Sequence, residues 1–273
     1  MIQDIYPSKL HNEYHNNTIT GDDYLLIFND KGEALIGDNS SISTFPQEKD
    51  VNMGDSIYLF SVDDKRYFLY NNWDTSKETV LDNYTYYSIK DVRDKVTGAD
   101  VYAAFTAFHL WKWYVDNQFC GKCGSELHLH DKERALKCDS CGNMVFPRIN
   151  PAVIVGVTNG DKILITKYRT GYAHSALIAG FTEIGETLEE TVAREVMEEA
   201  GIKVKNITYY KSQPWGMAQD ILMGFYCEVD GDDTIHMDKN ELRYAEWVNR
   251  EDVELQPNNL SLTNEMMQLF KEG

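Results

Sequence analysis

Residues 180–202 read GFTEIGETLEETVAREVMEEAGI, and seven of these 23 residues are glutamate. Thr187 is followed three residues later by Glu190, which is the capping-box pattern of a helix start. Gly201 stands where a left-handed residue commonly ends a helix. The pattern predicts a helix of about three and a half turns. Its apolar stripe consists of Leu188, Val192, Val196 and Ala200, widened by Ala193 and Met197.

Three of the glutamates share one face of this helix. Glu195, Glu198 and Glu199 stand at positions i, i+3 and i+4, so their carboxylates are neighbours. Like charges at this spacing weaken a helix by roughly 0.2–0.5 kcal/mol per pair, and a hard divalent cation would offset that repulsion. The alternative interpretation is a solvated acidic face.

The order of the residues distinguishes these two interpretations. From Gly180 to Ile202 the order is G-x5-E-x7-R-E-U-x-E-E-x-G-U, in which U is an aliphatic residue. At every position the stretch resembles the signature of the Nudix hydrolases, which cut the P–O–P bond of a nucleoside diphosphate linked to another group. The resemblance implies an α/β/α sandwich and a catalytic Mg²⁺ or Mn²⁺ ion.

The same resemblance implies a role for individual residues. It assigns the metal to Glu195, Glu199, the carbonyl of Ala179 and Glu241, with Glu246 as the second choice for Glu241. Glu198 would ligate the metal or activate water, Arg194 would orient the carboxylates, and Glu186 would tether the loop ahead of the helix.

Two Cys-x-x-Cys pairs, separated by fourteen residues, are formed by Cys120, Cys123, Cys138 and Cys141. This spacing suits tetrahedral Zn–thiolate geometry and predicts a zinc ribbon with one structural Zn²⁺ per chain. The alternatives are disulfides or a redox pair, and disulfides are disfavoured because the chain shows no export signal. His128 and His130 lie between the pairs and are interpreted as surface residues, and Cys227 as a half-buried apolar residue.

A second resemblance follows the glutamate helix. Residues 212–215 read SQPW and, together with the ribbon, are similar to the bacterial NADH pyrophosphatases, whose pattern continues PFPxS where residues 216–220 read GMAQD. The resemblance implies hydrolysis of NAD(H) to AMP and nicotinamide mononucleotide, removal of NAD caps from RNA, and a homodimer. The residues it places along the substrate are Gln213, Pro214, Trp215, Gly216, Met217, Ala218, Gln219 and Asp220, with Phe146 stacking on a ring and Glu133 touching the nucleotide.

Two rival functions remain open at this point. One is a Nudix hydrolase acting on ADP-ribose, coenzyme A or a deaminated nucleotide. The other is a regulator whose Nudix domain binds a nucleotide without cutting it. The complete run from Arg194 to Glu199 favours an enzyme over such a regulator.

The chain of 273 residues carries a formal net charge of −18, which disfavours nonspecific attraction to nucleic acid or anionic membranes. A cytoplasmic protein is expected, because no apolar run reaches roughly 18 residues and the N-terminus lacks the pattern of a signal peptide. Short aromatic and β-branched runs predict a mostly-β domain over residues 1–97. A linking helix, whose aromatic stripe is core or subunit interface, and the ribbon follow over residues 98–147, and the Nudix α-β-α sandwich over residues 148–273.

Overall fold

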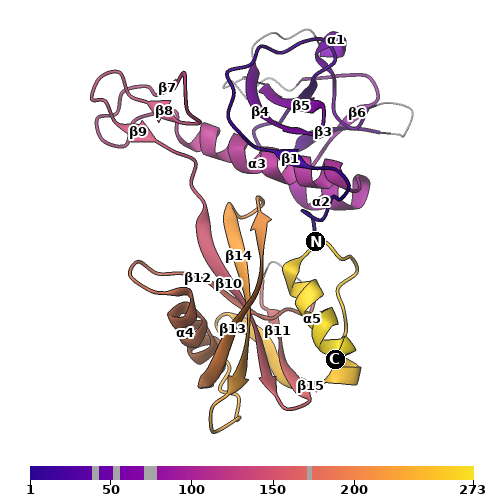
Figure 1. Ribbon diagram of the computed structural model, residues 1–273, viewed down its shortest axis with the longest axis vertical. Coiled ribbons are helices and arrows are strands. Elements are labelled where there is room, and N and C mark those ends of the chain that lie inside the picture. Colours follow the sequence, from indigo (N-terminus) through magenta and orange to yellow (C-terminus); the bar gives the residue numbers. More distant parts are fainter. Residues whose placement is uncertain (39–42, 52–55, 71–78, 171–173) are drawn as a thin grey trace. The chain divides into compact units, whose positions relative to one another are not determined.

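The computed structural model describes residues 1–38, 43–51, 56–70, 79–170 and 174–273, which fall into two compact units (Figure 1). The C-terminal unit comprises residues 149–214 and 220–273 together with Met1 and Ile2. The N-terminal unit comprises residues 3–148 and 215–219. The division into three domains stays a prediction, since the helix and ribbon of residues 98–147 fall within the same compact unit as the mostly-β segment.

The C-terminal unit is built on one six-stranded sheet with the order β13-β14-β10-β11-β15, in which β12 also pairs with β10. Its strands are β10 (Asn150–Asn159), β11 (Lys162–Tyr168), β12 (Ile178–Phe181), β13 (Val204–Trp215), β14 (Asp220–Val229) and β15 (Leu242–Asn249). Strands β10 and β14 run parallel, whereas β10 pairs antiparallel with β11 and β12. Strands β10 and β11 form a hairpin that turns at Gly160, which has a positive φ of 59°.

Two helices cover opposite faces of this sheet, α4 (Leu188–Ala200) on one side and α5 (Leu262–Glu272) on the other (Figure 1). The short 3-10 helix η1 (Arg250–Asp252) follows β15. Alternation along the strands supplies a core to each face. In β10, Val153 and Val155 pack with Val196 of α4, while Ile154 packs with Met266 of α5. This arrangement confirms the predicted α/β/α layering.

The limits of α4 are those that the sequence predicts. Thr187 accepts a hydrogen bond from the backbone of Glu190, and the Glu190 side chain accepts one from the backbone of Thr187, which completes the capping box. Gly201 ends the helix in the left-handed conformation with φ 69°. The predicted stripe is wrong at one position, because Met197 is 40% exposed and lies at its edge rather than in the core.

The N-terminal unit contains a four-stranded sheet with the order β1-β4-β5-β2 and a two-stranded sheet of β3 and β6. The strands are β1 (Leu10–His11), β2 (Tyr24–Leu26), β3 (Ala34–Gly37), β4 (Ser56–Val62), β5 (Lys65–Tyr70) and β6 (Tyr84–Tyr87). This confirms the mostly-β prediction. Besides the short helix α1 (Glu48–Val51), the structure adds α2 (Ile89–Lys95), which sequence analysis missed and which begins at a Ser88 cap.

Helix α3 (Ala99–Asp116) follows and carries the predicted aromatic stripe. Phe105, Trp111 and Trp113 are buried, and Phe28 of the β-rich segment packs against the Trp111 ring. The stripe is therefore core. The ribbon completes the unit with three short strands in the order β7-β8-β9: β7 (His128–Leu129), β8 (Leu136–Lys137) and β9 (Met144–Val145). Within the described residues, no helix is both long enough and apolar enough to cross a membrane.

Candidate active site

The candidate site lies where strand β12 packs against helix α4. Strand β12 pairs with β10, which holds Ala179 opposite Ile154 and Gly180 opposite Val153. Glu195 projects from α4 onto Gly180, and a Cβ atom at residue 180 would overlap the Glu195 carboxyl group. Glycine is therefore required here by close approach, since its φ is not positive.

Arg194 ties the acidic residues of this region together. Its Nε and Nη2 atoms donate to the two oxygens of Glu186 over 2.6 and 3.0 Å. Its Nη1 donates to Glu195 over 2.8 Å and to Glu198 over 2.9 Å, and Nη2 also donates to the Phe181 carbonyl over 2.9 Å. All five guanidinium N–H groups are thus engaged within the protein.

Glu186 is held as a carboxylate at the end of the loop between β12 and α4. Beyond Arg194, it accepts hydrogen bonds from the hydroxyl of Thr191 and from the backbone N–H of Glu183. The hydrogen bonds from Arg194, above all, lower the pKa of Glu186 to about 2. The loop is therefore fixed to the helix that follows it.

The two carboxyl groups that the helix buries are Glu195 and Glu199, which are 9% and 2% exposed. Burial raises the pKa of Glu195, and burial with the nearby charges of Glu195 and Glu241 raises that of Glu199 to about 8. The Oε2 atom of Glu199 is buried without a hydrogen-bond partner. Of the three glutamates on this face, Glu198 is the one that is exposed. The alternative interpretation, a solvated acidic face, therefore holds for Glu198 and not for Glu195 or Glu199.

Groups from outside the helix approach the same carboxylates. Glu241 and Asp238, from the segment ahead of β15, act on Glu199 through their charges, and Tyr168 at the end of β11 faces Glu199 and Glu195. Burial, followed by the charge of Glu199, raises the pKa of Tyr168. Sequence reasoning missed Tyr168 and Asp238, because no motif marks them and tertiary packing brings them here.

The structure also separates the two candidates for the fourth acidic ligand. Glu246 lies directly opposite Ile165 in the pairing of β11 with β15. Directly paired residues share one face of a sheet, and Ile165 packs in the core against α5. Glu246 therefore lies on the face away from α4, whereas Glu241 acts on Glu199.

The donor set suits a hard divalent cation, since it consists of carboxylates with one buried oxygen left unpaired. Glu195, Glu199 and Glu241 fit this role chemically. In the part of the chain that the structure describes, however, their oxygens are not gathered as tightly as the sulfur atoms of the ribbon, which all lie within 4.8 Å of one another. Arg194 holds Glu195 and Glu198 in the arrangement seen.

The four predicted ribbon cysteines do form a ligand group. The Sγ atoms of Cys120 and Cys141 are 3.7 Å apart, and those of Cys123 and Cys138 are 3.4 Å apart. Tetrahedral coordination with Zn–S bonds of about 2.3 Å places sulfur atoms about 3.8 Å apart, so the group fits zinc. Neither of the predicted surface histidines belongs to it. Cys227 is fully buried in the core of the C-terminal unit, deeper than the half-burial predicted.

The turn formed by residues 215–219 packs within the N-terminal unit. The Trp215 ring contacts the Phe105 ring with centroids 5.3 Å apart, and a Cβ at Gly216 would collide with the Phe105 carbonyl. Gln219 has a positive φ of 59° and accepts a hydrogen bond from Arg148 over 2.9 Å. Met217 and Ala218 are half-buried and exposed respectively.

A recess of about 310 Å³ brings two of the predicted substrate residues together. Phe146, which is 55% exposed, and Gln219 line it with Trp113 and Arg148. Its exposure shows that Phe146 is not a core residue. Glu133 is exposed on the ribbon and does not line this recess.

The remaining predicted substrate residues lie in the C-terminal unit. Gln213 is fully buried, and its amide donates to the Leu260 carbonyl over 2.8 Å and accepts from the Leu262 N–H over 2.7 Å. Pro214 is exposed. Asp220 is buried with Oδ1 unpaired, and burial raises its pKa to about 7.

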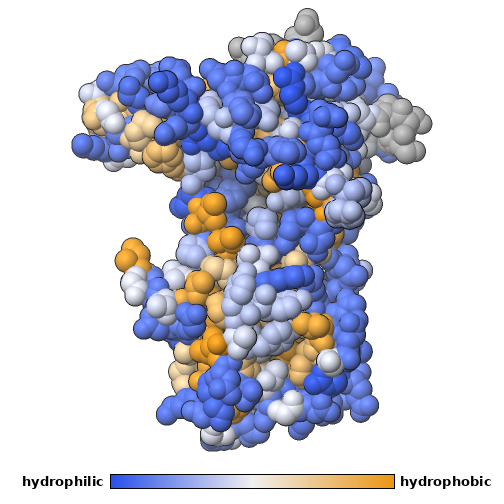
Figure 2. Space-filling view, viewed as in Figure 1, coloured by the Kyte–Doolittle hydropathy of each residue, from blue (hydrophilic) through white to orange (hydrophobic). Residues whose placement is uncertain are grey.

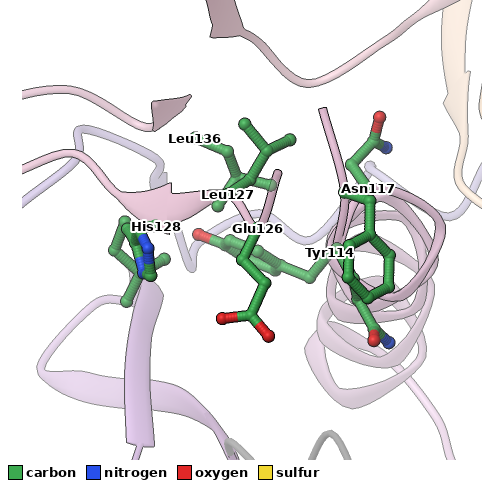
Figure 3. A pocket seen from close by; sticks show the side chains of 9 residues that line it. Tyr114, Asn117, Glu126, Leu127, His128 and Leu136 are labelled. Carbon is green, nitrogen blue, oxygen red and sulfur yellow. The ribbon is translucent and has the colours of Figure 1, made fainter. Parts of the chain in front are cut away.

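A larger recess of about 450 Å³ lies beside the ribbon, between the end of α3 and strands β7 and β8 (Figure 3). Tyr114 comes from the helix and Asn117 caps its end, whereas Glu126, His128 and Leu136 come from the ribbon (Figure 3). None of the predicted substrate residues lines it.

An exposed aromatic residue beside the glutamate helix was also missed by sequence analysis. Phe181 is 53% exposed at the end of β12, and its carbonyl is held by Arg194. Ile184, in the loop that follows, is fully exposed. Figure 2 shows hydrophobic atoms at the tip of this loop, between β12 and α4. An apolar side chain here could have been noticed in the sequence, but its exposure could not.

Comparison with known proteins gives matches for the C-terminal segment and for the ribbon. Residues 148–270 match the family described as NUDIX domain, and residues 116–146 match the NADH pyrophosphatase zinc ribbon domain. The chain is 41% identical over 174 residues to the NAD-capped RNA hydrolase NudC of Klebsiella pneumoniae, covering 62% of this chain and 66% of that protein. It is 43% identical over 151 residues to the protein of the same name from Escherichia coli, covering 54% and 58%.

The chain thus spans less than two thirds of the length of these curated relatives. Among solved structures, a NUDIX hydrolase from Nitrosomonas europaea superposes with a TM-score of 0.50 and 21% identity, over 57% of this chain and 90% of that one, which shows a shared fold. Residues 148–270 therefore belong to the Nudix family, and the residues 116–146 ahead of them form a zinc ribbon of the NADH pyrophosphatase type.

Proposed function

We propose that the protein hydrolyses the pyrophosphate bond of NAD(H), giving AMP and nicotinamide mononucleotide, and cuts the same bond in NAD-capped RNA. The observation that carries the proposal is the pair of buried glutamates, Glu195 and Glu199, set beside Arg194 at the end of a tethered loop. The match to a ribbon named for NADH pyrophosphatases, and relatives named NAD-capped RNA hydrolases, support this substrate class.

Mg²⁺ or Mn²⁺ is the proposed cofactor of this site. When bound, such an ion neutralises the phosphate charge and lowers the pKa of water, which is the chemistry that pyrophosphate hydrolysis needs. Glu195, Glu199, Glu241 and the Ala179 carbonyl are the proposed ligands. Glu198, which is exposed and next to Glu199, is proposed to ligate the metal or to activate the attacking water by accepting its proton.

Arg194 and Glu186 have a positioning role in this proposal. Every N–H group of Arg194 is engaged with a carboxylate or a backbone carbonyl, so none is left for a phosphate. The guanidinium group of Arg194 instead sets the separation between the carboxylates of Glu195 and Glu198. Glu186 anchors this guanidinium group to the loop by accepting two hydrogen bonds from it, one on each carboxylate oxygen.

The recess of the N-terminal unit supports binding of an aromatic ring. Phe146 offers a face for stacking, and the recess is also lined by one positive and one negative side chain, Arg148 and Asp116. Residues 215–219, which belong to the same unit, are proposed to contact the substrate, whereas substrate contacts of Pro214, Asp220 and Glu133 stay predictions. One structural Zn²⁺ held by the four cysteines is proposed to keep the ribbon folded. The homodimer is a further prediction, for which sedimentation velocity is the test.

Product analysis by mass spectrometry tests the activity. The protein is incubated with NADH, NAD⁺, NAD-capped RNA, ADP-ribose and coenzyme A, each with Mg²⁺ or Mn²⁺. Glu199→Gln is the test variant, and Glu189→Gln, an exposed glutamate on the same helix, is the matched control. AMP with nicotinamide mononucleotide, lost in Glu199→Gln and kept in Glu189→Gln, is the expected result.

Other outcomes reject the proposal in distinguishable ways. Cleavage restricted to ADP-ribose or coenzyme A would move the protein to another Nudix substrate, which the change from PFPxS to GMAQD at residues 216–220 leaves as the second candidate. Tight nucleotide binding without any cleavage would make the domain a sensor.

A further inference from the structure

Tyr168 is the one aromatic hydroxyl that the described structure places among the acidic groups of the candidate site. It ends strand β11, and its ring packs against the core that includes Val196 and Ala200 of α4. Register explains this placement, because Tyr168 pairs with Leu242, which belongs to the same core. The side chain thus lies on the α4 face of the sheet.

Two buried polar atoms in this place have no hydrogen-bond partner, the hydroxyl of Tyr168 and Oε2 of Glu199. Both side chains approach the backbone of Ala179, so they lie in the same small region. The charges of Glu195 and Glu241 also act on the hydroxyl. Each of these two atoms is buried and lacks a partner at hydrogen-bonding geometry, and both side chains pack beside the same strand, β12.

An unpaired hydroxyl in this position is unfavourable for the fold by itself. Phenylalanine would pack the same ring against α4 and would bury no unsatisfied polar group. The hydroxyl is thus explained by another state of the site, in which the carboxylates bind a cation and need outer hydrogen bonds to hold their orientation. A phenol supplies such a donor without adding charge.

We propose that Tyr168 is a positioning residue whose hydroxyl donates a hydrogen bond to Glu199 and so orients this carboxylate toward the divalent cation. The proposal rests on the proposed function, because it assumes that Glu199 is a metal ligand. It assigns no contact of Tyr168 with substrate.

Titration of the zinc-loaded full chain with Mn²⁺ tests the proposal. Binding is measured from the electron paramagnetic resonance signal of the Mn²⁺ that remains free. Tyr168→Phe keeps the ring, and its Kd for Mn²⁺ is expected to rise on the order of tenfold, as for other outer-sphere partners of metal ligands. Its unfolding midpoint without Mn²⁺ is expected to equal or exceed that of the unaltered protein.

Tyr226→Phe is the matched control. Tyr226 lies on the α5 face, and its hydroxyl donates to the Met266 carbonyl, so its removal should lower the unfolding midpoint and leave the Kd for Mn²⁺ unchanged. An unchanged Kd in Tyr168→Phe would overturn the positioning role. If Glu199→Gln also bound Mn²⁺ normally, or the unaltered protein bound none, the metal site itself and with it the proposed function would fail.

Discussion

The carboxyl group of Glu195 occupies the space where a side chain of residue 180 would be, and Gly180 leaves that space open. Strand β12 and helix α4 are thereby pressed together at the point where Glu195 is held by Arg194. The glycine that begins the family signature and the glutamate fifteen residues later are thus one structural unit. Their fixed spacing follows from the loop that connects a strand to a helix lying on it.

Gly180→Ala should displace the Glu195 carboxylate. We expect NADH hydrolysis to fall on the order of 10²-fold, since a shift of about 1 Å in a reacting group has this effect. The far-ultraviolet circular dichroism spectrum should stay unchanged. Gly21→Ala is the control, because a Cβ there meets an ordinary contact 3.5 Å away. Equal kcat/KM for Gly180→Ala and the unaltered protein would contradict the role of this contact.

Glu199 should make the stability of the protein depend on pH when Mg²⁺ and Mn²⁺ are absent. Its pKa is about 8 in the fold against an ordinary 4.5, chiefly because of burial, with Glu195, Glu241 and Asp238 adding repulsion. Between these values the folded protein keeps a proton that the unfolded chain releases, so stability falls as pH rises from about 4.5 to 8. The loss is a few kcal/mol at most, since one pKa unit corresponds to ~1.4 kcal/mol.

Urea unfolding at a series of pH values measures this effect. Glu199→Gln should flatten the decline and be more stable than the unaltered protein at pH 8, while Glu189→Gln should follow the unaltered curve. Added Mn²⁺ should stabilise the unaltered protein at pH 8 and have little effect on Glu199→Gln. If the stability of Glu199→Gln still fell steeply with rising pH, groups other than Glu199 would be responsible for the decline.

Cys138→Ser should remove zinc from the ribbon. Cys138 is fully buried within the four-cysteine group, so losing its thiolate leaves an incomplete tetrahedral site. Zinc content measured by atomic emission should fall from about one ion per chain to well below one. Cys227→Ala is the control, because this thiol lies in the core of the C-terminal unit. Retention of a full equivalent of zinc by Cys138→Ser would contradict the assignment.

The parts of the site that were predictable are those whose chemistry is local in sequence. The capping box at Thr187, the left-handed Gly201 and the cysteine pairs each depend on residues a few positions apart, and the structure has each of them. The layering of the C-terminal unit was likewise predictable, because alternation and helical spacing are short-range patterns.

The rest depends on contacts between distant segments. Tyr168 faces Glu199 because strand register puts it on the α4 face, and Glu246 lies on the opposite face for the same reason. The burial depth of the glutamates could not be predicted either, because Glu198 is exposed and its neighbour Glu199 is buried on the same predicted face. Helical spacing places carboxylates on a face, but tertiary packing decides which of them lose water.

Gln213 was predicted to contact substrate, and its contacts indicate a structural tie. Its amide joins β13 to the segment ahead of α5, with the Leu262 N–H donating to it and the Leu260 carbonyl accepting from it. The Leu260 carbonyl also accepts from the backbone N–H of Ile2. Gln213→Leu should therefore lower the free energy of unfolding by about 1–3 kcal/mol, because it leaves the buried Leu262 N–H unpaired.

Steady-state kinetics with NADH, together with urea unfolding, separate the two roles of Gln213. A structural tie predicts lower stability with an unchanged KM, whereas a substrate contact predicts a higher KM with unchanged stability. Gln268→Leu is the control, because its amide bonds the exposed Glu272 on α5 and its loss should change stability by less than about 0.5 kcal/mol. A rise in KM at full stability would return Gln213 to the substrate wall and would reassign the contacts with Leu260 and Leu262 to a minor role.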